Sequence, residues 1–191
     1  GYLELLEQEE LPKKAEEYVA VIENRTQMLR DMTEELFDYS VDVSTKLKLT
    51  SESVDVNRIL QESIAAFYTE FMECGITPEI HMSEKRIMRQ ADPAALSRVF
   101  ANLLNNAIKY SDGDLQITLS EDGEILFSNM AADLNNVEVA RLFDRFYTIE
   151  NARRSRGLGL SISKILVEKM GGEISADYEE QRLVICVKLR E

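Results

Sequence analysis

The stretch FANLLNNAIKYSDGD, residues 100–114, places three asparagines inside an apolar pattern of helical spacing. Its phenylalanine, leucines and isoleucine recur as they do on the core-facing side of an amphipathic helix. Asparagine is a mediocre helix former that prefers caps and turns. Three asparagines within two turns therefore lower the stability of the helix unless a partner or a ligand offsets the loss.

Two of these asparagines are spaced to act together. Asn102 and Asn106 are four residues apart, so their side chains share one face of the helix, and Lys109 lies beside that face. Amide oxygens are hard, neutral ligands, and Mg²⁺ takes a few protein oxygens together with substrate phosphates. The spacing therefore fits a magnesium–nucleotide site, but it fits equally well two core asparagines bonded to backbone.

A basic segment with two glycines favours the magnesium–nucleotide interpretation. Residues 141–164 hold six basic and two acidic residues, in a chain of net charge −13. The basic residues are Arg141, Arg145, Arg153, Arg154, Arg156 and Lys164, and the acidic ones are Asp144 and Glu150. Gly157 and Gly159 come directly before a predicted helix, where free backbone N–H groups and the helix dipole favour phosphate. The alternative is that the glycines only form a turn.

Composition excludes several other classes of function. The 191 residues are 45% hydrophobic and have a pI near 4.7, so we expect no nucleic-acid partner. No apolar run is long enough to span a membrane. Cys74 and Cys186 match no metal or redox spacing, and we expect reduced, buried thiols. His81, the only histidine, lies in an alternating stretch and is expected to be a strand residue.

The first part of the chain predicts paired helices. Residues 13–43 carry a heptad pattern, and GYLELLE at residues 1–7 indicates the end of a preceding helix, so we expect a helical hairpin over residues 1–45. Two helices bury little surface, so we expect a homodimer through residues 13–43. The alternative is a hairpin packed on its own domain. The heptad positions are Tyr18, Ile22, Arg25, Leu29, Met32, Leu36, Tyr39 and Val43.

Residues 46–191 predict a second domain of class α+β, a mixed sheet with helices on one face. We expect an edge strand from Lys46, a helix over 56–74 capped by Asp55, and a long helix that starts at Asp92 and Pro93. The other expected strands are 76–82, 85–90, 115–120, 124–128, 173–178 and 182–189, and the other expected helices are 137–142 and 160–170.

The motifs together resemble one family closely. RVFANLLNNAIKYS (98–111) looks like the N box of bacterial sensor histidine kinases, whose ATP-binding domains belong to the GHKL superfamily. LFDRFYTIENARRSRGLGLSISKILVEKMGG (142–172) is similar to their F box, ATP lid and second glycine box, and GYLELLE resembles the end of their first dimerisation helix. The resemblance implies a Bergerat-type ATP-binding sandwich that binds ATP and Mg²⁺.

The resemblance also implies roles for individual residues. Asn102 and Asn106 would hold Mg²⁺, Lys109 and Tyr110 would contact phosphate and nucleotide, and Arg145 would approach the γ-phosphate. Gly157, Leu158, Gly159 and Leu160 would close the phosphate end. Where the family has Asp-x-Gly-x-Gly, this chain has NMAAD (129–133); Asn129 can still pair with adenine because an amide offers both a donor and an acceptor.

Finally, the resemblance implies a signalling reaction. The acceptor histidine would lie just upstream of Gly1, in a longer protein anchored in the membrane with this part in the cytoplasm, and the phosphoryl group would pass to the receiver domain of a response regulator. Superfamily ATPases such as gyrase carry Glu where this chain has Asn102, and an amide cannot accept the proton of an attacking water. The NMAAD box leaves one alternative, a non-catalytic relative that works by dimerisation and partner binding.

Overall fold

The computed structural model describes residues 12, 14–15, 18–22, 25–26, 49–111, 113–132, 134, 139–144, 147 and 157–191. The chain divides into two compact units, Gly1–Val41 and Asp42–Glu191. In the first unit, residues 14–15, 18–22 and 25–26 are helical, and Tyr18 and Ile22 are exposed. The rest of the predicted 13–43 interface lies outside the described residues. Within the described part of the chain, no helix is both long and apolar enough to cross a membrane.

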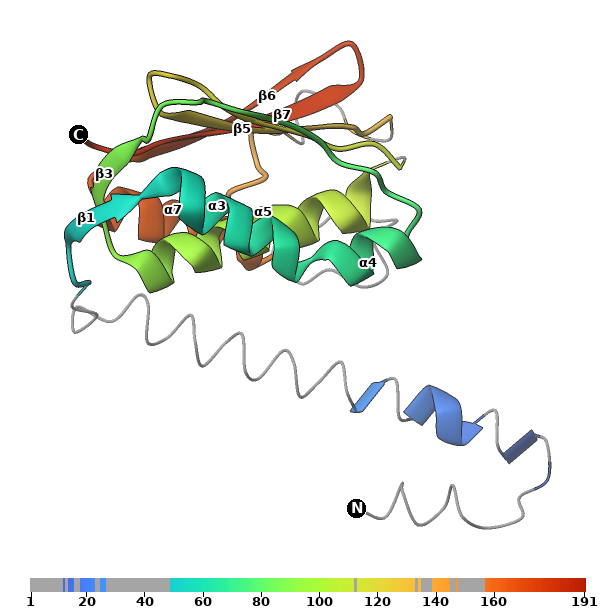
Figure 1. Cartoon of the computed structure of the whole chain (residues 1–191). Helices are drawn as coiled ribbons and strands as arrows, with labels where there is room; N and C mark the ends of the chain where they lie inside the picture. The colour runs from blue at the N-terminus through green and yellow to red at the C-terminus, as the bar shows by residue number, and fades with distance from the viewer. Residues whose placement is uncertain are drawn as a thin grey trace. The chain divides into compact units, whose positions relative to one another are not determined.

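The second unit is a mixed sheet with helices on one face (Figure 1). Five strands follow the spatial order β2 (Glu79–Met82), β4 (Gln116–Leu119), β5 (Glu124–Met130), β7 (Arg182–Lys188), β6 (Glu173–Glu179). The β2–β4 pair is parallel and the other pairs are antiparallel. The main helices that cover the sheet are α3 (Val56–Ala66), α5 (Pro93–Tyr110) and α7 (Gly159–Lys169). The predicted α+β class is confirmed.

The asparagine-containing helix forms where the sequence predicts it. The Asp92 carboxylate accepts a hydrogen bond from the Ala95 backbone N–H at 2.9 Å, and Pro93 occupies the first turn, so α5 begins with a cap and a pre-set φ angle. One face of α5 is buried against the sheet, where the Phe100 and Phe127 ring centroids lie 6.1 Å apart. The buried residues of α5 are Ala95, Leu96, Val99, Phe100, Leu103, Leu104 and Ala107.

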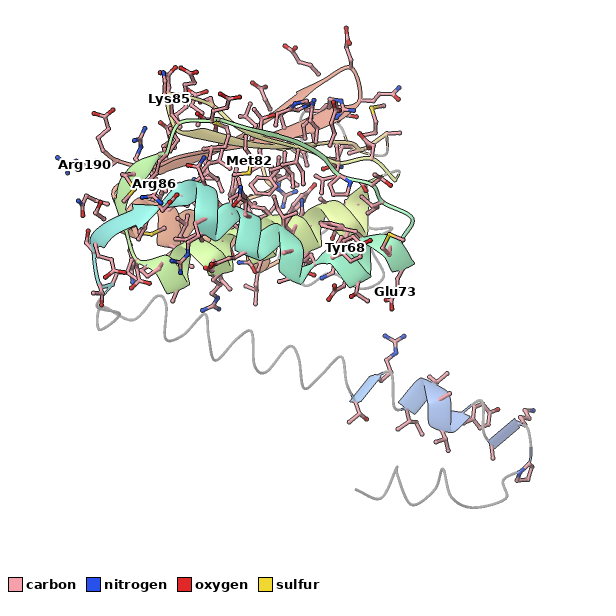
Figure 2. All side chains as sticks on the ribbon, viewed as in Figure 1. Tyr68, Glu73, Met82, Lys85, Arg86 and Arg190 are labelled. Carbon is pink, nitrogen blue, oxygen red and sulfur yellow. The ribbon has the colours of Figure 1, made fainter. Side chains whose placement is uncertain are left out.

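The alternation of β5 decides which residues face the helices. Phe127 contacts α5, and Asn129, two residues further along the strand, therefore lies on the same face. His81 is aligned with Thr118, one residue after the inward-facing Ile117, and so lies on the opposite face. Figure 2 shows Met82, the neighbour of His81, pointing into the space between sheet and helices, whereas Glu73 lies on the side of α4 (Tyr68–Glu73) away from the sheet.

One sequence prediction about this unit was wrong, and the edge strand expected from Lys46 is confirmed only in part. The predicted helix 56–74 is interrupted at Phe67, which has φ −98° and ψ 9° and separates α3 from α4. The edge strand expected from Lys46 contains only β1 (Glu52–Asp55) among the described residues. With β3 (Met88–Ala91), β1 makes a separate two-stranded sheet and does not join the main one. In the predicted helix 137–142, Val139 is helical and residues 140–142 form turns.

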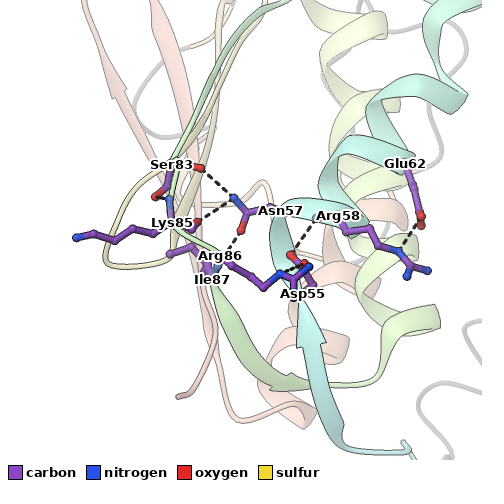
Figure 3. Close-up of polar contacts among 8 residues, drawn as sticks. All are labelled: Asp55, Asn57, Arg58, Glu62, Ser83, Lys85, Arg86 and Ile87. Atoms are coloured by element: carbon purple, nitrogen blue, oxygen red, sulfur yellow. Dashed lines mark hydrogen bonds and ion pairs between the residues drawn. The ribbon is translucent and has the colours of Figure 1, made fainter.

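A polar cluster fixes the start of α3 to the β2–β3 connection (Figure 3). Asp55 caps α3 by accepting from the Arg58 N–H at 3.2 Å, as predicted, and its carboxylate pairs with Arg86 at 2.9 Å. The Asn57 side chain donates to the Ser83 and Lys85 carbonyls at 3.0 and 3.1 Å, and its oxygen accepts from the Ile87 N–H at 2.8 Å. These bonds tie residues 83–87 to the helix layer.

Candidate functional site

The candidate site lies where α5 packs against the N-terminal turn of α7. The Asn102 side chain, half-buried on α5, donates from Nδ2 to the Gly159 carbonyl oxygen at 3.1 Å and to Ser163 Oγ at 3.2 Å. Gly159 and Ser163 are both on α7, one turn apart. The first asparagine of the predicted site and the glycine segment are therefore in direct contact, although 57 residues separate them in sequence.

The two partners of Asn102 define the orientation of its amide. The Gly159 carbonyl can only accept a hydrogen bond, and Ser163 Oγ gives its single hydrogen to that carbonyl at 2.9 Å. Both partners must therefore receive hydrogens from the Asn102 NH₂ group. The Asn102 Oδ1 atom has no donor among the described residues, so its lone pairs are available to a cation or another ligand.

Asn106, one turn further along α5, has an amide without a hydrogen-bond partner among the described residues. Its side chain is half-buried and makes no hydrogen bond within the part of the chain that the structure describes. Together, Asn102 Oδ1 and the Asn106 amide oxygen give two neutral oxygen ligands on neighbouring turns. This donor set fits Mg²⁺, which combines a few protein oxygens with water and phosphate.

The last turn of α5 holds the next two predicted residues. Lys109 is exposed in this turn and Tyr110, half-buried, is the final residue of the helix. Since Asn102, Asn106 and Lys109 follow one another at spacings of four and three, they lie along one side of α5. Lys109, the positively charged residue of this row, thus follows the two asparagines toward the C-terminal end of α5.

The glycine segment ends in a helix start with no side-chain cap. Gly157 has φ +67°, a conformation that glycine adopts without strain, and Leu158 after it is 3% exposed. The helix α7 begins at Gly159. The residue before it, Leu158, has an apolar side chain that does not bond to the first N–H groups of the helix. These N–H groups have no partner within the helix and could receive phosphate oxygens. Leu160, the last predicted member of this group, is half-buried.

Asn129 lies at the end of β5 on the side of the sheet that faces the helices. It is 4% exposed, and its Nδ2 atom donates to the Met130 carbonyl at 2.8 Å. Ala131, which stands where the family has its first glycine, is held by two bonds: its N–H donates to the Gln181 carbonyl at 2.8 Å and its carbonyl accepts from the Tyr178 hydroxyl at 3.0 Å. These bonds hold residues 129–131 in place at the end of β5.

The basic segment is described only in part. The Arg141 guanidinium lies 4.4 Å from the centroid of the Tyr147 ring, and its Nε atom is 3.5 Å from the Asp144 carboxylate. The Lys164 ammonium, on α7, lies 5.6 Å from the centroid of the Phe143 ring. These two cations contact aromatic rings within the protein. Arg145, predicted to approach the γ-phosphate, lies outside the described residues, as do Arg153, Arg154 and Arg156.

Other polar groups of the second unit do not belong to this site. His81 lies on the opposite face of the sheet from Asn129, and its Nε2 atom contacts the Glu79 carboxylate at 2.9 Å. A groove beside β1 is lined by Asp55, Arg58 and Arg86, among others, but these charges are paired: Asp55 with Arg86, and Arg58 with Glu62 at 2.9 Å. Among the described residues, no cluster of His, Cys, Asp or Glu could hold a metal ion.

The two cysteines differ in their surroundings. Cys74 is exposed and Cys186 is half-buried, so the expectation that both are buried was wrong for Cys74. Burial raises the pKa of the Cys186 thiol, and the neighbouring Glu124 carboxylate raises it further. Neither residue lies near α5 or the start of α7 in sequence, and both thiols are free, as predicted.

Comparison with known proteins agrees with this geometry. Residues 91–191 match the family described as histidine kinase-, DNA gyrase B-, and HSP90-like ATPases, a range that contains α5, α7 and Asn129. The chain therefore belongs to this family of ATPases. The resemblance to sensor histidine kinases is confirmed as well, since similar proteins carry that name.

Two relatives illustrate the likeness. The chain is 28% identical over 199 residues to the sensor protein VanSC of Enterococcus gallinarum, an alignment that covers 99% of this chain and 55% of that protein. It is 30% identical over 202 residues to the sensor histidine kinase YcbM of Bacillus subtilis (strain 168), with 98% and 65% covered. The chain thus spans less than two thirds of the length of these relatives.

A solved structure shows the same fold. The full-length ShkA crystallised in complex with AMPPNP superimposes with a TM-score of 0.77 at 23% sequence identity, over 98% of this chain and 41% of that one. At this level of identity the likeness shows the fold alone. It confirms the predicted fold, a sandwich of the histidine-kinase type.

The sequence analysis assigned no role to Ser163. This residue is completely buried, and it is the only described side chain that Asn102 contacts by a hydrogen bond. One signal could have drawn attention to it: Ser163 follows Gly159 by four residues and therefore shares its face of α7.

Proposed function

We propose that this chain binds Mg·ATP at the contact between α5 and α7. One observation carries the proposal: the Asn102 NH₂ group bonds to Gly159 and Ser163, while Asn102 Oδ1 and the Asn106 amide have no hydrogen-bond partner among the described residues. Asn102 and Asn106 would hold Mg²⁺ through their amide oxygens. The bound ion would neutralise charge on the ATP phosphates.

The remaining site residues would contact the nucleotide. Lys109 supplies a positive charge for phosphate, and Tyr110 would contact the nucleotide beside it. The N–H groups at Gly157, Leu158, Gly159 and Leu160 would receive phosphate oxygens at the start of α7. Asn129 would pair with adenine, with its Oδ1 atom as acceptor, and Arg145 would approach the γ-phosphate.

We further propose that the chain is the catalytic part of a longer sensor histidine kinase. The domains would be a partial helical hairpin, residues 1–45, and an ATP-binding domain, residues 46–191. In the whole protein the γ-phosphoryl group would pass to a histidine upstream of Gly1, and then to an aspartate in the receiver domain of a response regulator. The names of the relatives support this reaction.

The chemistry of Asn102 supports transfer to a protein over hydrolysis. A hydrolytic enzyme needs a base for the attacking water, and an amide is not a base. We propose homodimerisation through residues 13–43, a cytoplasmic position for this part, and a membrane anchor elsewhere in the whole protein. No role in nucleic-acid binding is proposed, because the chain is strongly acidic.

A calorimetric titration tests the nucleotide site. The chain is titrated with an unhydrolysable ATP analogue, with Mg²⁺ and with a chelator instead. We expect binding that is much tighter with Mg²⁺. Absence of binding by the folded protein at millimolar analogue would contradict the proposal and favour a non-catalytic relative that acts by dimerisation.

A labelling experiment tests the transfer step. Incubation of the whole protein with γ-labelled ATP should give an acid-labile phosphoprotein, and an added receiver domain should take the label. The chain of residues 1–191 should stay unlabelled, because His81 lies on the face of the sheet opposite Asn129. Stable label on His81 would contradict this assignment.

A further inference from the structure

We propose that Ser163 is a positioning residue that holds the Asn102 amide in the orientation needed to bind the cation. The inference rests on the proposed Mg·ATP site. Ser163 is 0% exposed, and its Oγ atom lies 3.2 Å from Asn102 Nδ2 and 2.9 Å from the Gly159 carbonyl oxygen. It therefore links α5 to the first turn of α7.

The direction of these bonds is what selects the orientation. The Ser163 hydroxyl has one hydrogen, which is given to the Gly159 carbonyl, so toward Asn102 it can only accept. An Asn102 amide turned by half a rotation would bring Oδ1 against two acceptors. The serine and the carbonyl thus hold the NH₂ group of Asn102 and leave Oδ1 without a donor among the described residues.

Other serines in the chain show that this arrangement is more than a common helix feature. Ser63 Oγ donates to the Ile59 carbonyl at 2.8 Å and Ser97 Oγ donates to the Pro93 carbonyl at 2.9 Å, both four residues back. Neither of these serines accepts a hydrogen bond from another helix among the described residues. Ser163 alone of the three makes a bond of this kind across a helix–helix contact.

The test measures the magnesium dependence of nucleotide binding in Ser163→Ala. Affinity for the unhydrolysable ATP analogue is titrated with Mg²⁺ and with chelator. We expect the affinity with Mg²⁺ to fall roughly threefold to tenfold, the range that one lost hydrogen bond gives, with little change in chelator. Ser161→Ala is the matched control, because Ser161 is 3% exposed on the same helix and, among the described residues, its hydroxyl bonds to the Leu158 carbonyl alone, at 2.8 Å.

A double-variant cycle asks whether Ser163 acts through Asn102. In the Asn102→Ala background, Ser163→Ala should have no further effect on the magnesium dependence. An equal loss in both backgrounds, or equal behaviour of Ser163→Ala and Ser161→Ala, would overturn the inference. If the unaltered protein shows no magnesium-dependent binding at all, the proposed function itself fails, which is a different result.

A measurement on the unaltered protein keeps the inference testable should Ser163→Ala fail to fold. The side-chain amide protons of Asn102 and of exposed Asn105 are compared for exchange with solvent by NMR. We expect both Asn102 protons to exchange more slowly, because each has a protein acceptor. Equal exchange of Asn102 and Asn105 would show that the amide is not held and would overturn the inference.

Discussion

Two half-buried asparagines, Asn57 at the start of α3 and Asn102 in the middle of α5, solve the same physical problem differently. Each donates two hydrogen bonds from Nδ2 to acceptors on another segment. The Asn57 oxygen also accepts from the Ile87 N–H at 2.8 Å (Figure 3), whereas the Asn102 oxygen has no donor among the described residues. Asn57, whose amide groups all have partners, stabilises the fold. Asn102, whose oxygen has no donor among the described residues, can bind a ligand through that oxygen.

The difference carries over to the surroundings of the two residues. Around Asn57 the neighbouring charged groups form ion pairs, Arg58 with Glu62 and Arg86 with Asp55. Around Asn102 the neighbouring Asn106 amide is free among the described residues, and the first N–H groups of α7 have no side-chain cap. The two regions therefore differ in their polar groups: those around Asn57 bond to one another, whereas some of those around Asn102 have no partner among the described residues.

The largest effect is expected for Asn106→Ala. This variant removes a proposed Mg²⁺ ligand, and we expect the magnesium-dependent affinity for an ATP analogue to fall at least about 100-fold, since even outer-shell partners of a metal contribute about 10- to 100-fold. The free energy of unfolding should stay unchanged, because the side chain makes no hydrogen bond to a described residue. Calorimetric titration and urea unfolding measure the two quantities. Undiminished binding would remove Asn106 from the site.

Asn57→Ala should have the opposite pattern. It removes three hydrogen bonds and leaves the Ile87 N–H, on a residue only 5% exposed, without its acceptor. We expect a loss of about 2 kcal/mol in the free energy of unfolding, measured in urea, and unchanged nucleotide affinity of the folded protein. Asn105→Ala, at an exposed position, is the control and should change stability by less than about 0.5 kcal/mol. Equal stability of the Asn57→Ala and Asn105→Ala variants would contradict the claim that the hydrogen bonds of Asn57 stabilise the fold.

Asn102→Asp tests the orientation of the amide. An ionised carboxylate cannot donate to the Gly159 carbonyl or to Ser163, so we expect a loss of about 1 kcal/mol in stability, with Asn106→Asp close to the unaltered protein. The loss should shrink as the pH falls, since a protonated carboxyl regains a donor. Urea unfolding at several pH values measures both effects. No destabilisation at neutral pH would mean that the Asn102 NH₂ group does not face α7.

The smallest effect concerns the thiols, where an accessible group and a shielded one can again be compared. Cys186 should react with iodoacetamide several-fold more slowly than exposed Cys74, because burial and Glu124 raise the pKa of Cys186 and the thiolate is the nucleophile. The rate of the Cys186 reaction should also rise at a higher pH than the rate of the Cys74 reaction does. Glu124→Gln should speed Cys186 alone, as followed by mass spectrometry. Equal rates for the two cysteines would contradict the assignment.

Local signals made much of the fold predictable. Asp92 followed by Pro93 marks the start of α5 because both residues favour the first turn of a helix, and the structure confirms this cap. The alternation of residues 124–128 and 182–189 likewise predicted two strands, and the structure has β5 and β7 there. These features depend on neighbours in the sequence, so the sequence contains them.

Features that depend on distant partners could not be predicted. The apolar pattern through residues 56–74 is continuous, and no Gly or Pro marks the break at Phe67. Alternation in 52–55 predicts a strand but not that its partner is β3. The bonds of Asn57 and Asn102 join residues 26 to 61 positions apart, so the sequence suggested Asn102 and Asn106 as a pair but could not show which atoms stay available.

The most direct measurement compares the side-chain amide signals of Asn57, Asn102 and Asn106 in one NMR spectrum. The protein with ¹⁵N-labelled asparagine is saturated with an unhydrolysable ATP analogue, and its side-chain amide signals are recorded by NMR as Mn²⁺ replaces Mg²⁺. The account predicts that the paramagnetic ion broadens the signals of Asn102 and Asn106, while the signal of Asn57 remains sharp. Sharp signals from Asn102 and Asn106 with the ion and nucleotide bound would contradict the claim that these two amides hold the metal.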